Sequence, residues 1–211
     1  MGTESYRAVA RPVEVRTQER RSVFLCRLEP ARDEAAARAV VEAARTRHGD
    51  AGHHCSAFLI GPGGALRRSH DDGEPSGTAG MPMLEVLSGA GLSDVVAVVT
   101  RWFGGVLLGT GGLARAYSGA VSAAVAEATV VRRTPVTLAE AVVRHESAGR
   151  LEHDLRTRGV TVRDVDYAAE VTLHLAVPPT DVDDLAASVA ALTSGQARWA
   201  VTGSDWVDLP D

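Results

Sequence analysis

Along most of the chain, apolar residues either alternate with polar ones or recur at helical spacing. Acids at its start and arginines at its end favour a helix over 33–47, and a β-branched run over 94–100 is typical of a central strand. The first two strands are expected to form a hairpin. The predicted strands are 6–15, 22–28, 55–60, 67–70 and 94–100, and the predicted helices are 33–47, 83–87 and 110–129.

The last third of the chain follows the order strand, helix, strand, strand, helix, strand. Its strands are expected over 136–144, 160–167, 170–177 and 197–206, and its helices over 147–158 and 181–192. This βαββαβ order is ferredoxin-like. The stretch VVRRTPV, 130–136, separates the two periodic blocks and is the best linker candidate. We therefore predict an α+β protein with one domain over 1–133 and a ferredoxin-like domain over 134–211.

The composition is that of a globular protein, with 45% hydrophobic and 23% charged residues among 211. No run of eighteen apolar residues is present, and the first residues lack the apolar segment of a signal peptide. We expect a cytoplasmic protein that does not bind a membrane. Cys26 and Cys55 are expected to be free, buried thiols, because a domain of this size does not need a disulfide.

All 22 basic residues are arginine. The lack of lysine excludes a Walker A lysine, a Schiff-base lysine and a lysine general base. The net charge of −5 and the pI near 5.8 argue against nonspecific coating of nucleic acid, which needs a basic field over the whole surface. The net charge does not exclude a local patch of arginines that binds nucleic acid.

The segment DDGEPSGTAGMP, 71–82, is longer and richer in hydrogen-bond acceptors than a segment that only reverses the chain direction needs to be. Its carboxylates are candidates for acid or base chemistry or for ligand binding. The alternative is that they, or the hydroxyl groups, cap the helix that follows. The candidate residues in this segment are Asp71, Asp72, Glu74, Ser76 and Thr78.

The segment RWFGGVLLGTGGLARAY, 101–117, follows the predicted central strand directly. Its glycines would let backbone N–H groups approach an anion, and the next helix offers a positive dipole end. A guanidinium beside aromatic rings would suit phosphate and a stacked base. The alternatives are glycines that only permit tight packing and rings that belong to the core. The candidate residues are Arg101, Trp102, Phe103, Gly104, Gly105, Gly109, Thr110, Gly111 and Gly112.

Three other site types have little support. The triplet His53-His54-Cys55 lacks the ligand spacing of a zinc site, so we expect no metal and place His53 and His54 as hydrogen-bonded residues near a polar cleft. The match to G-x-G-x-x-A at 109–114 starts too far from the strand for dinucleotide binding. No G-x-S-x-G elbow is present, so no catalytic residue and no cofactor is assigned.

These motifs together resemble the YigZ/IMPACT family. The resemblance runs through HHC at 53–55, DDGEPSGTAG at 71–80, Met83-Leu84, Leu87, Leu92, Val98-Val99 and RWFGGVLLG at 101–109, and the restart PVTL near 135 fits its bacterial two-domain members. One position departs from it. The family often has a basic residue between a serine and a phenylalanine in the second strand, where this chain has Val23.

The resemblance implies a two-layer α/β first domain like that of a small-subunit ribosomal protein, of domain IV of elongation factor G and of the GHMP kinases. It implies a second domain like domain V of that elongation factor. We expect the loop 71–82 and the turn 101–112 to form one polar cleft. The favoured function is a translation-associated regulator, without catalysis, that binds RNA, the ribosome or a protein partner. The alternative is a small-molecule phosphate binder or enzyme, with magnesium held by Asp71, Asp72 or Glu74.

Overall fold

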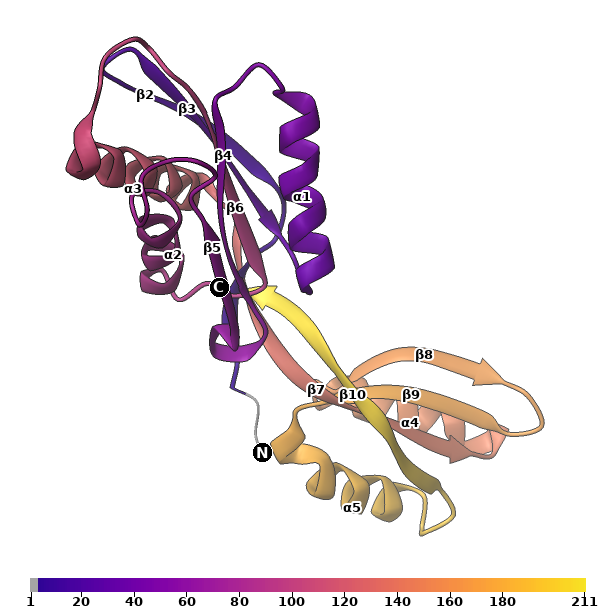
Figure 1. Cartoon of the computed structure of the whole chain (residues 1–211). Helices are drawn as coiled ribbons and strands as arrows, with labels where there is room; N and C mark the ends of the chain where they lie inside the picture. Colours follow the sequence, from indigo (N-terminus) through magenta and orange to yellow (C-terminus); the bar gives the residue numbers. More distant parts are fainter. Residues whose placement is uncertain (1–3) are drawn as a thin grey trace. The chain divides into compact units, whose positions relative to one another are not determined.

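The computed structural model describes residues 4–211, which form two compact units. One unit comprises 5–133 with 208–211, and the other is built mainly of 134–207. No helix in the described part of the chain is both long and apolar enough to cross a membrane. In chain order the elements are β1 (Tyr6–Val9), β2 (Val13–Glu19), β3 (Ser22–Pro30), α1 (Glu34–Arg47), β4 (His53–Ile60), β5 (Leu66–His70), α2 (Gly80–Gly89), β6 (Val95–Trp102), α3 (Gly109–Glu127), β7 (Val130–Val143), α4 (His145–Thr157), β8 (Thr161–Tyr167), β9 (Val171–Val177), α5 (Val182–Leu192) and β10 (Arg198–Pro210) (Figure 1).

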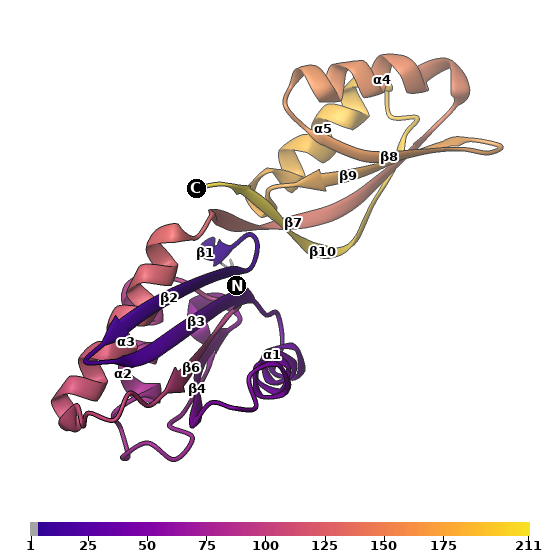
Figure 2. The same cartoon turned by 90° about the horizontal axis from the view of Figure 1, so that it is seen from above.

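The first unit is an antiparallel sheet in the order β2-β3-β6-β4-β5. Helices α2 and α3 cover one face, which is the predicted two-layer arrangement, and α1 adds a helix over the opposite face (Figure 2). Strand β6 is apolar on both faces because both are covered. Cys26 and Cys55 flank Val99 on the α3 side and are free and buried, as predicted.

The second unit has the strand order β10-β7-β9-β8. Its buried side chains form one cluster in which α4 and α5 pack on the strands, with Leu151 and Leu185 among the helical contributions. This is the 4-1-3-2 order of a ferredoxin-like sheet, so the predicted α+β class and the predicted element order of this unit are confirmed.

Two predicted segments differ from the structure. The expected linker, 130–136, is the first part of strand β7, because Val130 to Arg133 pair with β1. The expected strand 6–15 is interrupted before β2: its first part pairs with β7, and only its second part forms the predicted hairpin with β3. Both errors come from pairing partners far away in sequence, which local signals such as Pro12 and Pro135 do not reveal.

The hairpin β2–β3 closes through two arginines in the left-handed region, Arg20 with φ 43° and Arg21 with φ 71°. A two-residue turn with both φ angles positive is type I′, which normally contains Asn and Gly. Arginine is strained in this conformation because of its Cβ.

The segment after β6 passes very close to this hairpin. A Cβ on Gly104 would lie 2.1 Å from the carbonyl carbon of Arg21, and the Gly104 N–H donates to Ser22 Oγ at 3.2 Å. Only glycine permits this approach, because the obstructing atoms belong to the backbone.

We expect Gly104→Ala to lower the free energy of unfolding by about 2–3 kcal/mol, because either the turn or the hairpin must shift. Urea denaturation of the whole chain measures the change. The control is Gly119→Ala in α3, where a Cβ meets no atom within 4 Å and should add about 0.5–1 kcal/mol. Equal stability of the two variants would contradict the close approach.

Candidate functional site

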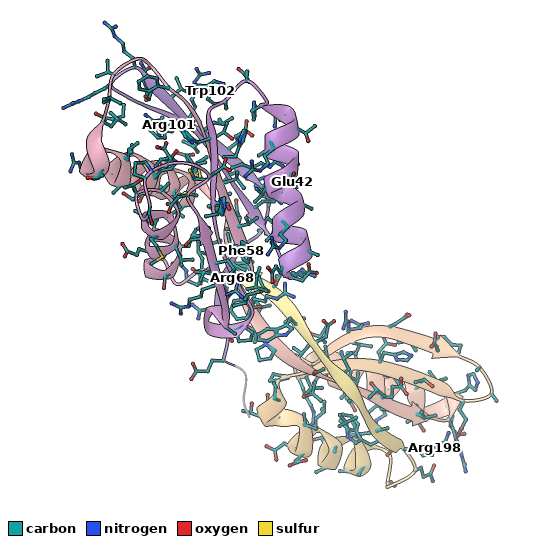
Figure 3. The ribbon with its side chains drawn as sticks, viewed as in Figure 1. Glu42, Phe58, Arg68, Arg101, Trp102 and Arg198 are labelled. Atoms are coloured by element: carbon teal, nitrogen blue, oxygen red, sulfur yellow. The ribbon has the colours of Figure 1, made fainter. Side chains whose placement is uncertain are left out.

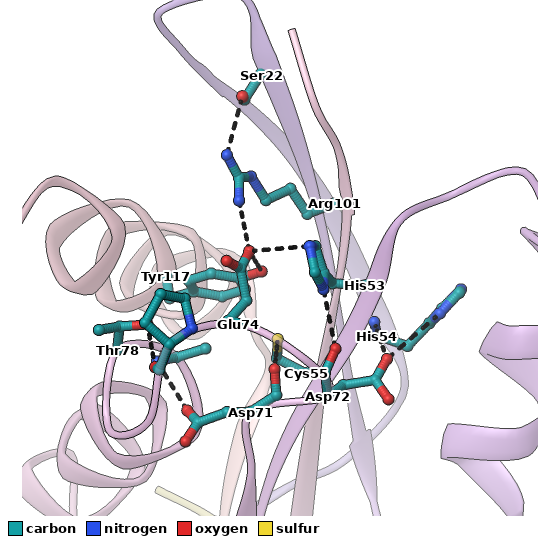
Figure 4. Close-up of polar contacts among 12 residues, drawn as sticks. Ser22, His53, His54, Cys55, Asp71, Asp72, Glu74, Thr78, Arg101 and Tyr117 are labelled. Carbon is teal, nitrogen blue, oxygen red and sulfur yellow. Dashed lines mark hydrogen bonds and ion pairs between the residues drawn. The ribbon is translucent and has the colours of Figure 1, made fainter. Parts of the chain in front are cut away.

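A buried ion pair between Arg101 and Glu74 lies at the centre of the candidate site (Figure 4). Arg101 Nη1 donates to Glu74 Oε1 at 2.6 Å, and the two side chains are 6% and 3% exposed. Strand register places His53 of β4 and Phe24 of β3 on either side of Arg101. The loop 71–82 is therefore tied to the end of the central strand by a charged contact that is shielded from water.

The guanidinium of Arg101 has further neighbours. Nη2 lies 3.4 Å from Ser22 Oγ, and Cζ lies 5.5 Å from the Phe24 ring centre and 5.6 Å from that of Phe103. Its buried Nε has no hydrogen-bond partner in the described part of the chain. This packing is consistent with the expectation that Arg101 is costly to bury without a counter-charge. Of the three acids in the loop, only Glu74 pairs with Arg101.

Tyr117 of α3 completes the buried cluster, and sequence reasoning missed it. Its hydroxyl donates to Glu74 Oε1 at 2.7 Å, and its ring meets Phe24 edge-on at 5.2 Å. Burial raises the pKa of Tyr117 far above its ordinary value, so the phenol stays protonated and remains a donor. The signal was available: Tyr117 stands four residues after Leu113 on the buried stripe of α3, and a buried tyrosine needs a partner for its hydroxyl.

His53 borders the same carboxylate. Its Nδ1 lies 2.9 Å from the carbonyl oxygen of Asp72, and its Nε2 lies 3.8 Å from Glu74 Oε1. A carbonyl only accepts, so Nδ1 carries the proton and donates. In the neutral ring Nε2 is then an acceptor.

His54 points elsewhere, because neighbouring residues in a strand face opposite ways. Its Nε2 lies 3.1 Å from the carbonyl oxygen of His48, and its backbone N–H donates to Asp72 Oδ2 at 2.6 Å. Burial lowers the pKa of His54. The predicted site residue His54 therefore lies outside the cluster around Glu74.

Cys55 lies beneath the loop. Its thiol donates to the carbonyl oxygen of Asp71 at 3.0 Å. Burial raises the pKa of the Cys55 thiol to about 12, so it remains protonated at neutral pH and supplies no nucleophile.

Asp71 lies nine residues before Gly80, the first residue of α2, and its side chain caps the start of this helix. Its carboxylate accepts from the backbone N–H groups of Gly77 at 2.8 Å, Ala79 at 3.0 Å and Gly80 at 2.8 Å. Burial by itself would raise the pKa of Asp71, but the three donors outweigh burial and lower it. The capping alternative therefore describes Asp71.

The other polar residues of the loop also have structural contacts. Asp72 accepts from Arg45 Nη2 of α1 at 2.6 Å, and Thr78 Oγ1 donates to the carbonyl oxygen of Pro75 at 2.6 Å. Donors from His54 and Arg45 outweigh burial and lower the pKa of Asp72. Ser76 is exposed and does not cap α2, since Asp71 takes that place.

The loop 71–82 and the turn 101–112 line one cavity of about 420 Å³, as expected from sequence. The loop contributes Glu74 and Pro75, and the turn contributes Arg101, Phe103 and residues 107–110. Most of the lining is apolar, whereas the prediction was a polar cleft. Gly105 and Gly109 have φ angles of 82° and 71°, which only glycine adopts without strain. Gly111 and Gly112 lie in the first turn of α3, and no side chain among the described residues caps this helix, whose N-cap residue is Leu108.

Trp102 does not line this cavity. Its Nε1 donates to Asp50 Oδ2 at 2.8 Å and its ring meets His48 at 5.3 Å, although it lies at the same end of the sheet as Arg101 (Figure 3). Alternation along β6 places the two side chains on opposite faces. Val23, where the family often has a basic residue, pairs with Trp102 in the strand register.

The arrangement offers no metal site. Within residues 4–211 no three His, Cys, Asp or Glu side chains are grouped so that they could hold an ion. Asp71, Asp72 and Glu74 each already bind protein donors, which leaves the magnesium alternative without a free set of ligands.

Comparison with known proteins gives consistent matches over both units. Residues 20–125 match the Impact N-terminal domain, and residues 143–196 match a domain of unknown function, DUF1949. The IMPACT family member YigZ of Escherichia coli is 39% identical over 92% of this chain and 97% of its own length. The IMPACT family member YvyE of Bacillus subtilis is 36% identical over 84% and 82%, respectively. The crystal structure of a hypothetical protein, 37% identical, superposes with a TM-score of 0.67 over 94% of this chain and 98% of its own.

We expect Arg101→Ala to cost about 3–5 kcal/mol of stability, because it leaves the Glu74 carboxylate buried without its counter-charge. The urea midpoint of the whole chain measures the loss. Arg115→Ala, at an exposed position of the same region, should change stability by no more than about 0.5 kcal/mol. The double variant Glu74→Gln/Arg101→Met removes both charges and should recover part of the loss. A wild-type midpoint for Arg101→Ala would contradict the pair's structural role.

The capping role of Asp71 predicts a specific dependence on pH. Its pKa is lowered in the folded chain, so its contribution is full above the carboxyl pKa of the unfolded chain and disappears as pH falls through the folded pKa. Asp71→Asn should therefore lose about 1 kcal/mol at pH 7 and progressively less toward pH 3. Urea titrations across this range measure the difference, with Ser76→Ala as the control in the same loop. A difference that grows on acidification would contradict the assignment.

Proposed function

The chain belongs to the IMPACT family, and from this we propose that it is a cytoplasmic, translation-associated regulator that binds RNA on the ribosome. The contact surface is the tip of the first unit, formed by the β2–β3 hairpin and the turn 101–112. No catalytic step is part of this proposal. The likeness of both units to domains of elongation factor G, which the family resemblance implies, supports a role in translation.

The single observation that carries the proposal is the hairpin Arg20-Arg21. Both residues are exposed and both have positive φ angles. Neither forms an ion pair among the described residues. Two strained arginines at a tip, where Asn and Gly would be more stable, are better explained by a partner than by folding.

The surroundings of the hairpin favour a nucleic acid partner. Arg16 adds a third exposed cation on β2. This strand also carries two exposed acids, Glu19 and Glu14, of which Glu14 is paired with Arg27 and Arg47. Phe103, 55% exposed, belongs to the same end of the unit because Gly104 packs on Arg21. Arginines that contact phosphate beside an exposed ring that stacks a base are the usual means of binding single-stranded RNA.

The net charge of −5 is compatible with a local site. Phosphate contact needs positive potential within about a Debye length, roughly 10 Å at 0.1 M salt. Arg101 does not supply it, because its charge is neutralised by Glu74. The phosphate contact expected there from sequence therefore passes to the hairpin arginines in this proposal.

The test uses Arg20→Asn/Arg21→Gly, which removes both charges while giving the turn its preferred residues. We expect this variant to unfold at a higher urea concentration than the wild type and to bind RNA at least tenfold more weakly. On single strands, loss of two phosphate contacts should also flatten the slope of log affinity against log salt by about 1.4. Co-sedimentation with ribosomes and fluorescence anisotropy of a labelled RNA measure these changes.

The matched control is Arg150→Ala/Arg158→Ala, which removes two exposed arginines from the second unit. It should behave as wild type if the hairpin is the contact. A wild-type chain that stays free of ribosomes at low salt would exclude the proposed function. Equal losses from both double variants would show a nonspecific effect of charge and exclude the hairpin as the site.

A further inference from the structure

The cavity of about 420 Å³ between the loop and the turn contains polar groups that folding leaves unused. Its size lies in the range of small-molecule sites. The RNA proposal above relies on the hairpin surface and assigns no role to the interior of this cavity.

Two acceptors face each other on one side. All hydrogen bonds and ion pairs of Glu74 within the described chain involve Oε1, so Oε2 of this side chain, which is only 3% exposed, accepts none. In the neutral ring, His53 Nε2 is the second acceptor, because Nδ1 donates to the carbonyl oxygen of Asp72 (Figure 4). A carboxylate oxygen that accepts no hydrogen bond from the protein can accept one from an N–H group of a ligand.

A donor set lies on the other side. The cavity includes Gly109 and Thr110, the first residues of α3, and this helix has no side-chain cap. The free N–H groups and the dipole of the first turn favour an anion such as phosphate. Thr110 and Gly111 are exposed, so an anion has access.

Between the acceptors and the donors the walls are apolar. Phe103 and Leu107 are 55% and 82% exposed, unusually high values for such side chains. Leu108 and Leu113 complete the wall. A flat ring entering here would cover apolar surface that is otherwise in water, and Phe103 offers an aromatic face for stacking.

We propose that this cavity binds one nucleoside monophosphate unit that carries an amino-bearing base. The base lies against Phe103 and donates from its ring N–H or amino group to Glu74 Oε2 and His53 Nε2. The phosphate lies at the N-terminus of α3. The unit is either a free nucleotide or one unstacked nucleotide of an RNA strand, and the second case rests on the proposed function.

The first experiment titrates the whole chain with GMP, UMP, guanosine and inorganic phosphate by isothermal titration calorimetry. We expect GMP to bind more tightly than the other three. UMP lacks an amino group on its base, guanosine lacks the phosphate, and inorganic phosphate lacks the base. Phosphate binding as tight as GMP would mean an adventitious anion site and would overturn the proposal. So would UMP binding as tight as GMP.

Two variants locate the site and keep both members of the buried pair. Phe103→Ala removes an exposed ring and should weaken GMP at least tenfold, in line with the loss of one base stack. Thr110→Glu places an acid in the first turn of α3, where it suits the helix dipole, so the fold is kept while phosphate is repelled. It should weaken GMP at least tenfold and guanosine much less.

Arg158→Ala, at an exposed position of the second unit, serves as the control and should bind GMP as the wild type does. GMP binding that neither Phe103→Ala nor Thr110→Glu weakens would place the nucleotide elsewhere and overturn the proposal. No binding of GMP, together with unchanged binding of RNA by Thr110→Glu, would overturn it as well. In that last case the hairpin proposal stands, since it is tested by Arg20→Asn/Arg21→Gly.

An eight-nucleotide guanine-rich single strand separates the two sources of the nucleotide unit. If the cavity holds an RNA nucleotide, the strand binds more tightly than GMP, and both Thr110→Glu and Arg20→Asn/Arg21→Gly weaken it. If the cavity holds a free nucleotide, GMP binds at least as tightly as the strand, and the hairpin variant leaves GMP binding unchanged. A strand whose binding depends on the hairpin but not on Thr110→Glu or Phe103→Ala contradicts an RNA nucleotide in the cavity.

Discussion

Arg101 lies near the end of the central strand β6, and its guanidinium is buried. Much of the first unit is arranged around the Glu74 carboxylate that neutralises this charge. A buried charge of this kind is tolerated only with a partner and further hydrogen bonds. Glu74 brings the loop 71–82 to the sheet, Tyr117 ties α3 to the same oxygen, and Ser22 extends the contact to the hairpin. Four segments distant in sequence thus share one polar cluster.

This arrangement divides the motif residues of β4 and β6 into two groups by the face of the sheet on which they lie. Residues in register with Arg101 on the α3 face, such as His53, meet the cavity. Their immediate neighbours His54 and Trp102 turn toward His48 and Asp50. Adjacent residues of one motif therefore contact different parts of the protein, because successive side chains in a strand point to opposite faces.

The same cluster limits what Arg101 can contribute to the binding of an anion. A paired guanidinium presents little net charge, so an acidic chain needs other cations if it is to meet phosphate. The hairpin provides them next to the turn, because Gly104 lets the two backbones touch. The free oxygen of Glu74 and the uncapped start of α3 then remain as the unused polar groups of the cavity.

The sequence by itself determined the α+β class and the ferredoxin-like element order of the second unit, since these depend on local periodicity and on turn residues such as Gly159 and Gly195. It also predicted that the loop and the turn lie together, and Glu74, Pro75 and Arg101 line one cavity. It could not give the pairing of 130–133 with β1, the choice of Glu74 as partner of Arg101, or the capping of α2 by Asp71. Those depend on which distant groups the packed sheet brings within hydrogen-bond distance, and only the tertiary structure decides that.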